Sequence, residues 1–152
     1  MIESREAARP PYRQALKAIG RYFDEQPCRG IFVAEVDEGY IGKAYPAHEP
    51  AELHAEGFTF PFEDVRSLIQ VATGTAPTVD GPPHCPYGYG VFMEAAGEVC
   101  DRAGASYVSV LEVTNAFVLC FTVPREDGRD LQRRRYVLDR IGVEELLNGA
   151  TV

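Results

Sequence analysis

The sequence predicts an α+β fold: a tandem α-β-β-β-α repeat forms a pseudo-twofold domain whose antiparallel sheet, or two sheets, is covered by helices. The chain has 152 residues, which is a usual length for a single domain. A shift of 77 residues aligns residues 12–45 with residues 89–122 without a gap. Both aligned segments carry the same order of helix and strand patterns, and this agreement is the main support for the predicted fold.

The aligned segments share seven identical pairs among 34 positions, whereas unrelated segments of ordinary composition share about two. The excess indicates two half-repeats, at about residues 10–73 and 89–148, within a single domain spanning residues 1–152. The identical pairs are Tyr12/Tyr89, Ala18/Ala95, Gly20/Gly97, Asp24/Asp101, Val33/Val110, Glu35/Glu112 and Val36/Val113.

In the first half, apolar residues at three- and four-residue spacing predict helices, and short runs rich in β-branched and aromatic residues predict strands. Prolines and glycines separate these patterns and mark where each element begins or ends. The expected elements are a helix over residues 12–23, strands over 31–36, 40–45 and 58–60, and a helix over 65–72.

The second half repeats this plan after a linker. Residues 74–88 hold three glycines and four prolines, which excludes a helix or a central strand. The charged residues 124–134 are expected to form a connection, and Asp139 is the predicted N-cap of the last helix. The expected elements are a helix over residues 92–103, strands over 107–113, 117–123 and 136–138, and a helix over 139–147.

Composition excludes several classes of function. Acidic residues outnumber basic ones 23 to 15, giving a net charge of -8, which disfavours binding to nucleic acids and to anionic membranes. No apolar run approaches the roughly 20 residues of a membrane span, so we expect a cytoplasmic protein. The four cysteines form no C-x-x-C pair, and motifs for phosphate loops, nucleophile elbows and zinc proteases are absent. We therefore expect no cofactor and no metal centre.

The order of elements, the size and the acidity resemble those of type III secretion chaperones. The TATA-binding fold is similar in having two α/β half-repeats, but the acidic balance argues against a DNA-binding saddle. The resemblance is one of topology, size and, for the chaperones, acidity, and a fold does not by itself imply a function.

Two glutamates are the first candidate ligand-binding residues. Glu35 and Glu112 occupy the same place in the repeat, at the end of the first hairpin strand. A twofold arrangement could bring both carboxylates to one site, where they could share a proton or hold a metal ion. His48 and His54 lie in a polar segment and could join them. In the simpler alternative, each glutamate marks where its strand reaches water and the histidines are solvated.

A second group of residues is expected to bind a partner. Arg133, Arg134 and Arg135 form the one basic cluster and could bind acidic groups through bidentate hydrogen bonds. Tyr40 and Phe117 occupy matching positions in the repeat and could contribute aromatic surface. Alternatively, the arginines form local ion pairs in a solvated loop.

These observations favour a non-enzymatic, cytoplasmic protein- or peptide-binding domain that is adaptor- or chaperone-like and forms a homodimer. Exposed sheet edges and aromatic faces suit such a role. The alternative is a small-molecule-binding domain or enzyme with a pocket between the half-repeats.

Overall fold

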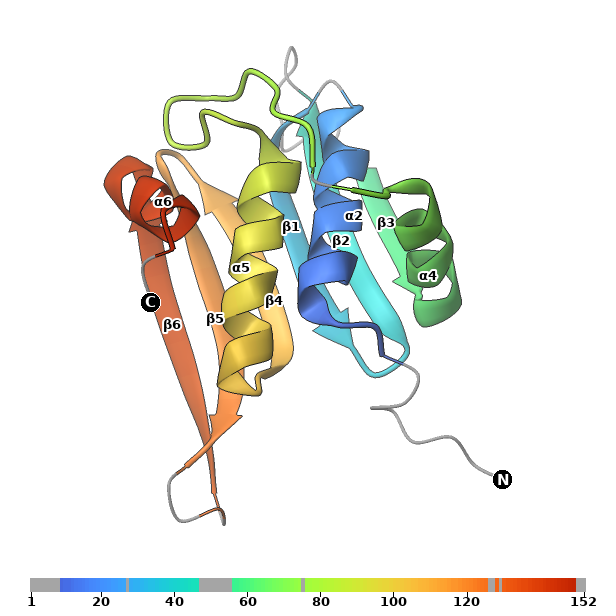
Figure 1. Cartoon of the computed structure of the whole chain (residues 1–152), viewed down its shortest axis with the longest axis vertical. Helices are drawn as coiled ribbons and strands as arrows, with labels where there is room; N and C mark the ends of the chain where they lie inside the picture. Colours follow the sequence, from blue (N-terminus) through green and yellow to red (C-terminus); the bar gives the residue numbers. More distant parts are fainter. Residues whose placement is uncertain are drawn as a thin grey trace.

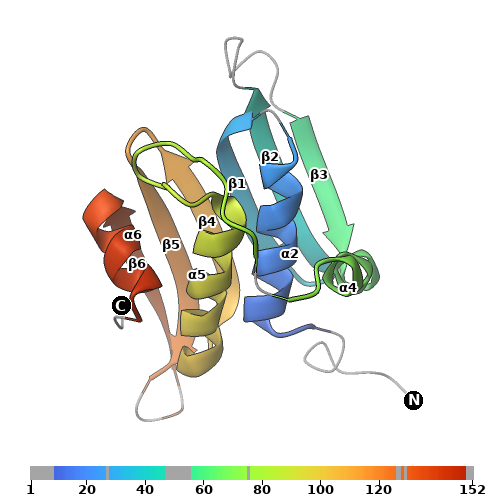
Figure 2. The same cartoon turned by 45° about the horizontal axis from the view of Figure 1, so that its top comes forward.

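The computed structural model describes residues 9–26, 28–46, 56–74, 76–125, 128 and 130–149. In this part of the chain, the helices and strands form two layers, with the helices lying on one face of a six-stranded sheet (Figures 1 and 2). The predicted α+β class is confirmed. The elements are α2 (Tyr12–Asp24), β1 (Cys28–Val36), β2 (Gly39–Pro46), β3 (Glu56–Pro61), α4 (Phe62–Val71), α5 (Tyr89–Ala103), β4 (Ser106–Val113), β5 (Ala116–Pro124), β6 (Leu131–Asp139) and α6 (Arg140–Leu147).

One sheet, rather than two, joins the halves. Its strand order is β3-β2-β1-β4-β5-β6, and every neighbouring pair is antiparallel. β1 pairs with β4 at the centre, where Val33 lies opposite Val110. These two valines are also equivalent under the 77-residue shift. The centre of the sheet is therefore the place where equivalent positions of the two half-repeats meet.

Helices α2 and α5 lie side by side across the middle of the sheet (Figures 1 and 2). Their contact is close because each presents a glycine to the first turn of the other. A Cβ atom on Gly20 would lie 2.7 Å from the Tyr89 carbonyl oxygen, and one on Gly97 would lie 2.5 Å from that of Tyr12. Only glycine lets the two backbones approach this closely. The repeated glycines are therefore packing residues.

The core fills the space between the helices and the sheet. Apolar stripes of α2 and α5 bury large side chains against the inward positions of the central strands, as the helical spacing predicts. The largest completely buried side chains include Phe23, Phe92, Phe117, Phe121, Leu16 and Ile19.

Two predicted connections have more structure than expected. Residues 131–135 belong to β6, which pairs with β5 along nine positions, whereas a short strand at 136–138 was predicted. The backbone partner supplied by β5 outweighs the weak strand propensity of this charged segment. In the predicted linker, the side chains of His84 and Cys85 are buried, and backbone hydrogen bonds join Val79 to Tyr87 and Gly81 to Pro86.

No helix within the described residues is long and apolar enough to span a membrane.

Candidate functional site

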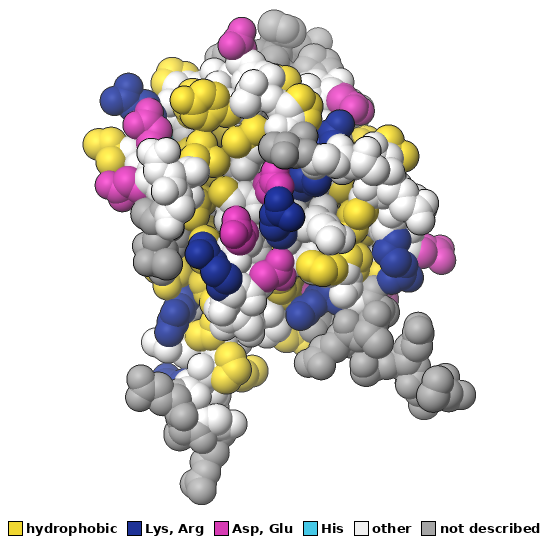
Figure 3. Space-filling model, in the orientation of Figure 1, with side chains coloured by type: hydrophobic (Ala, Val, Ile, Leu, Met, Phe, Trp, Pro, Cys, Tyr) yellow, Lys and Arg dark blue, Asp and Glu magenta, His cyan; other side chains and the backbone are white. Residues whose placement is uncertain are grey.

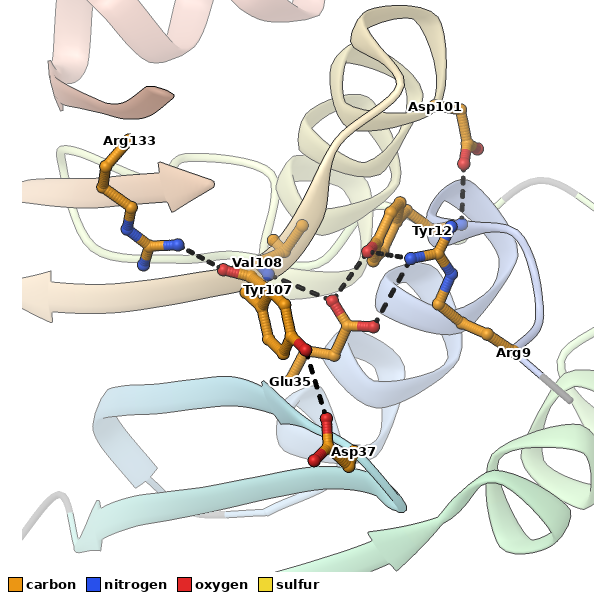
Figure 4. Close-up of polar contacts among 8 residues, drawn as sticks. All are labelled: Arg9, Tyr12, Glu35, Asp37, Asp101, Tyr107, Val108 and Arg133. Carbon is orange, nitrogen blue, oxygen red and sulfur yellow. Dashed lines mark hydrogen bonds and ion pairs between the residues drawn. The ribbon is translucent and has the colours of Figure 1, made fainter. Parts of the chain in front are cut away.

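Glu35 is the centre of a closed polar cluster in the first half (Figure 4). Its side chain is 0% exposed. The Tyr12 hydroxyl donates to Glu35 Oε1 over 2.6 Å, and the backbone N–H of Val108 donates to the same oxygen over 3.1 Å. The Arg9 guanidinium lies 3.7 Å from Oε2, stacks on the Tyr12 ring and donates to its hydroxyl over 2.7 Å. The buried carboxylate is thus fully engaged by hydrogen bonds and a cation, as a buried charge requires.

Glu112 forms the equivalent cluster in the second half. Its side chain is 3% exposed, and the Tyr89 hydroxyl donates to Oε1 over 2.6 Å. The Tyr89 hydroxyl in turn accepts from the backbone N–H of Gly30 over 3.2 Å. His84 Nε2 lies 2.5 Å from Glu112 Oε2, in the role that Arg9 has in the first half. The repeated tyrosine and glutamate therefore form matching pairs with different basic partners.

A β-bulge helps to build each cluster. β1 and β4 both deviate from regular pairing close to their first residues. Gly30 has φ 117 in the first bulge, and Tyr107 has φ 53 in the second. The two are equivalent under the 77-residue shift. A bulge re-aims backbone groups, and here the N–H groups of Gly30 and Val108 point toward the clusters.

The repeated aspartates cap the opposite helices. The Asp101 carboxylate accepts the first two backbone N–H groups of α2 over 2.9 and 3.0 Å. The Asp24 carboxylate accepts the first two of α5 over 2.8 and 2.9 Å. Burial raises the pKa of the Asp24 carboxyl, although these hydrogen bonds oppose the rise. Because each aspartate belongs to one half and caps the helix of the other, these contacts tie the two halves together.

The two glutamates do not share a site. Glu35 lies against Val108, and Glu112 is four residues further along β4, about 13 Å of strand. Each carboxylate instead bonds the tyrosine at the start of its own half. Because β1 and β4 are antiparallel and Val33 lies opposite Val110, residues that follow these two valines along the chain lie in opposite directions from the pair.

A cleft of about 570 Å³ opens beside the Glu112 cluster. Residues of both halves line it, but Glu35 does not. Its walls come from the first half, the 76–88 segment and the β4–β5 turn, and include Gly30, Tyr45, His84, Glu112, Thr114 and Asn115. This size is typical of sites for small organic molecules.

The thiols and phenols near these clusters stay protonated. Burial raises the pKa of Cys28 to about 11 and that of Cys85 and Cys100 to about 12. Burial likewise raises the pKa of Tyr12 and Tyr89, so their hydroxyls remain donors to the glutamates. A thiol must ionise to act as a nucleophile, and these three thiols do not ionise near neutral pH.

The other predicted ligand and partner residues divide into three groups. His48 and His54 lie outside the described residues. Tyr40 and Phe117 are 0% exposed, so they belong to the core rather than to a partner-facing surface. Inward strand positions bury both rings, and Tyr40 Oη is a buried atom without a hydrogen-bond partner.

The three arginines belong to β6 and alternate between its two sides. Arg133 pairs with Thr122 and Arg135 with Cys120, on the side of the sheet away from the helices, whereas Arg134 pairs with Phe121 on the helix side. Arg133 also donates to the Tyr107 carbonyl oxygen over 2.5 Å (Figure 4). Figure 3 shows the helix side, where acidic and basic side chains are interspersed.

The side of the sheet away from the described helices is here called the open face. Strand alternation turns Phe32 toward the open face, while its neighbour Val33 is buried under the helices. The registers of β1, β4, β5 and β6 place apolar residues in one row across this face. The row consists of Phe32, Leu111, Val118 and Val137. Sequence reasoning missed this surface, although its signal was present: several strands are apolar at both even and odd positions, a pattern typical of strands covered on both faces.

Comparison with known proteins identifies no relative: no family model, no curated protein and no solved structure matches this chain. Within the described residues, no three His, Cys, Asp or Glu side chains are grouped to hold a metal ion.

Proposed function

We propose that this chain is a non-enzymatic protein-binding domain whose open face docks an acidic, partly apolar segment of a partner protein. One observation carries the proposal: a row of apolar residues, Phe32, Leu111, Val118 and Val137, crosses the open face in register. An antiparallel sheet with one face in water normally alternates between apolar and polar residues. Here Leu111 and Ile41 are each 39% exposed and Val137 is 63% exposed. Neighbouring exposed apolar residues of this kind are typical of protein interaction surfaces.

The charges around the apolar row favour an acidic partner. Lys43 lies beside Phe32 at one end of the row, and Arg135 and Arg133 lie on β6 near the other end. Among the described strand residues of the open face, Asp139 alone has a carboxylate, and it caps α6 by accepting the Gly142 N–H over 2.9 Å. The face is thus basic on a chain with net charge -8. Complementary charge steers such a surface toward acidic partners.

The same charges argue against a dimer formed by two open faces. An isologous interface places one surface against a copy of itself. Two such faces would bring cations together with no free strand carboxylate between them. We therefore favour a different protein over a second copy as the occupant of this face.

The chemistry of the clusters supports a binding role rather than catalysis. Glu35 and Glu112 are engaged by internal donors, and the thiols of Cys28, Cys85 and Cys100 remain protonated. All four cysteines are free thiols, which suits a reducing compartment, and we place the protein in the cytoplasm.

The test uses two synthetic peptides with the same apolar positions, one with glutamate and one with lysine at the polar positions. Binding is measured by fluorescence anisotropy, and contacts are mapped by backbone amide NMR shifts. We expect the acidic peptide to bind more tightly and to shift amides near Leu111 and Val118. Arg135→Glu should weaken its binding about five- to tenfold.

Arg134→Glu is the matched control, because it changes the same charge on the adjacent residue, which faces the helix side. It should alter the affinity less than about twofold. Equal binding of the two peptides, or equal effects of the two substitutions, would contradict the proposal. Sedimentation should show a monomer, and a dimer whose interface maps to the open face would replace the partner with a second copy.

A further inference from the structure

The apolar row on the open face runs across the strands rather than along them. The registers place Phe32 opposite Leu111, Leu111 opposite Val118, and Val118 opposite Val137. Each of these residues belongs to a different strand, and neighbouring strands lie about 4.8 Å apart. The row is therefore about 14 Å long and presents one apolar side chain per strand.

The three inner strands of the row offer no backbone groups to a ligand that lies on this face. Phe32 is paired on both sides, with Lys43 of β2 and Leu111 of β4. Leu111 and Val118 likewise have a paired residue on each side. The N–H and C=O groups of paired strands point within the sheet toward these neighbours. A segment that docks on the face must therefore satisfy its own backbone groups, because an unpaired backbone group removed from water costs free energy.

An α-helix meets this requirement and also matches the spacing of the row. Its interior N–H and C=O groups bond one another, and each turn rises about 5.4 Å. Apolar side chains at positions i, i+4, i+7 and i+11 lie on one side of a helix, so one apolar residue per turn can meet one strand of the row. An extended segment places side chains of one side about 6.6 Å apart and leaves its backbone groups unpaired. The face therefore favours a helix over an extended segment.

Cations lie at the two ends of the row. Lys43 follows Phe32 on β2, and Arg135 is the next outward residue to Val137 on β6. The distance from β2 to β6 is four strand spacings, about 19 Å, which is the length of about 13 helical residues. No ion pair within the described residues engages either cation. Acidic groups are therefore favoured at both ends of a helix that lies along the row.

We propose that the occupant of the open face is an amphipathic α-helix of a partner protein, which lies along the apolar row and crosses the strands. This inference rests on the proposed function and adds the conformation, direction and charge pattern of the partner segment. An apolar residue on each turn packs against the row. Acidic residues in the first and last turns of the helix meet Lys43 and Arg135.

The test compares three peptides of about 16 residues built from leucine, alanine and glutamate. The helical peptide has leucines at i, i+4, i+7 and i+11 and glutamates in its first and last turns. The alternating peptide has the same composition, with the leucines at every second position. In the proline peptide, one central alanine of the helical peptide, on the side away from the leucines, is replaced by proline, which breaks a helix. Fluorescence anisotropy measures affinity, circular dichroism measures helix content, and backbone amide NMR shifts locate the contact.

We expect the helical peptide to be helical in the complex and to shift the amides of Phe32, Leu111, Val118 and Val137. It should bind at least about tenfold more tightly than the alternating and proline peptides. Equal affinity of the three peptides, or a bound peptide without helix, would overturn this inference, and shifts that still map to the open face would then leave the proposed function standing. Failure of all three peptides to bind this face would overturn both.

Charge variants test the direction of the helix. Lys43→Gln and Arg135→Gln should each weaken binding of the helical peptide about threefold, because each removes the contact at one end. Replacing the glutamates at one end of the peptide by glutamine should abolish the effect of one substitution and preserve that of the other. Arg134→Gln, on the helix side, is the matched control and should change the affinity less than about twofold. Coupling of both cations to the same end of the peptide would overturn the placement of the helix along the row.

Discussion

The Glu35 and Glu112 clusters are built from the same repeated residues but have different surroundings. In each, a tyrosine at the start of the central helix donates to a glutamate on the central strand. Arg9 completes the first cluster by contacting both the tyrosine and the glutamate. His84 completes the second, and its ring also lies against Phe117 and lines the cleft.

The difference shows which part of the two matching clusters varies. A buried carboxylate needs donors and a compensating group, so the tyrosine and glutamate must stay together. The basic partner comes from a segment outside the aligned repeat, and two different residues meet the requirement. Arginine, with its five donors, contacts both the tyrosine and the glutamate of one cluster, whereas the imidazole of the other contacts the glutamate through Nε2.

The largest expected effect concerns the helix contact that both halves share. Gly97→Ala should lower the free energy of unfolding by about 3 kcal/mol, and Gly20→Ala by about 2 kcal/mol, because each Cβ would meet backbone atoms of the other helix. The clash is closer at Gly97, 2.5 Å against 2.7 Å. Urea denaturation measures both.

Gly142→Ala is the control for this pair. It lies in α6, and the atom nearest to its added Cβ is the flexible Leu138 Cδ2 at 3.3 Å. Because alanine has a higher helix propensity than glycine, the Gly142→Ala variant should be as stable as the wild type or more stable. Equal effects at all three glycines would contradict the close helix contact.

The next largest effect is the loss of stability when the tyrosine hydroxyl is removed from each polar cluster, which should be larger for the Glu35 cluster than for the Glu112 cluster. Tyr12→Phe should destabilise the fold by about 2 kcal/mol and Tyr89→Phe by about 1 kcal/mol. Water cannot replace the lost donor at Glu35, which is 0% exposed, but can approach Glu112 from the cleft. Thermal and urea unfolding measure the difference, with Tyr87→Phe as the exposed control. A larger loss for Tyr89→Phe would show that the second cluster is the more closed one.

The pH dependence of stability should reveal the cap supplied by the first half. Burial raises the pKa of the folded Asp24 carboxyl above its ordinary value of 3.8. Ionisation of Asp24 therefore costs the folded state more than the unfolded state. The contribution of the protonated Asp24 carboxyl to folding stability is fully present below pH 3.8 and is lost as the pH rises through the pKa of the folded state.

Asp24→Asn removes this titration. Measured by urea unfolding from about pH 3 to about pH 7, the stability of the wild type relative to the variant should fall as the pH rises. A constant difference, or one that grows with pH, would contradict the effect of burial on this carboxyl.

The smallest effect concerns the two bulges. The backbone of Tyr107 has φ 53, in the left-handed region where a residue with a side chain is strained. Its equivalent Gly30 has φ 117 and, because glycine lacks a Cβ atom, does not carry this strain. Tyr107→Gly should change stability by less than about 0.5 kcal/mol, because relief of strain offsets the lost hydroxyl contact with Asp37. Gly30→Ala should destabilise by about 1 kcal/mol. Equal effects in differential scanning calorimetry would show that the two bulges tolerate side chains alike.

The helices, the hairpins and the order of elements could be predicted from the sequence because they depend on local patterns. Apolar spacing, prolines and turn residues specify whether a segment is helix or strand, and Asp139 caps the last helix as its sequence position predicts. The alignment of the two segments also singled out the identical pairs Tyr12/Tyr89, Gly20/Gly97, Asp24/Asp101 and Glu35/Glu112. It did not reveal that they contact one another or the opposite half.

Tertiary structure decided the position of each functional residue. Pairing of β1 with β4 separated Glu35 from Glu112, and pairing of β5 with β6 turned an expected loop into a strand with Arg133 and Arg134 on opposite sides. These outcomes depend on strand register, because a shift of one residue moves a side chain to the other face. The sequence by itself therefore determined the elements and the residues that pair, whereas register and helix packing decided which carboxylate meets His84 and which face stays open.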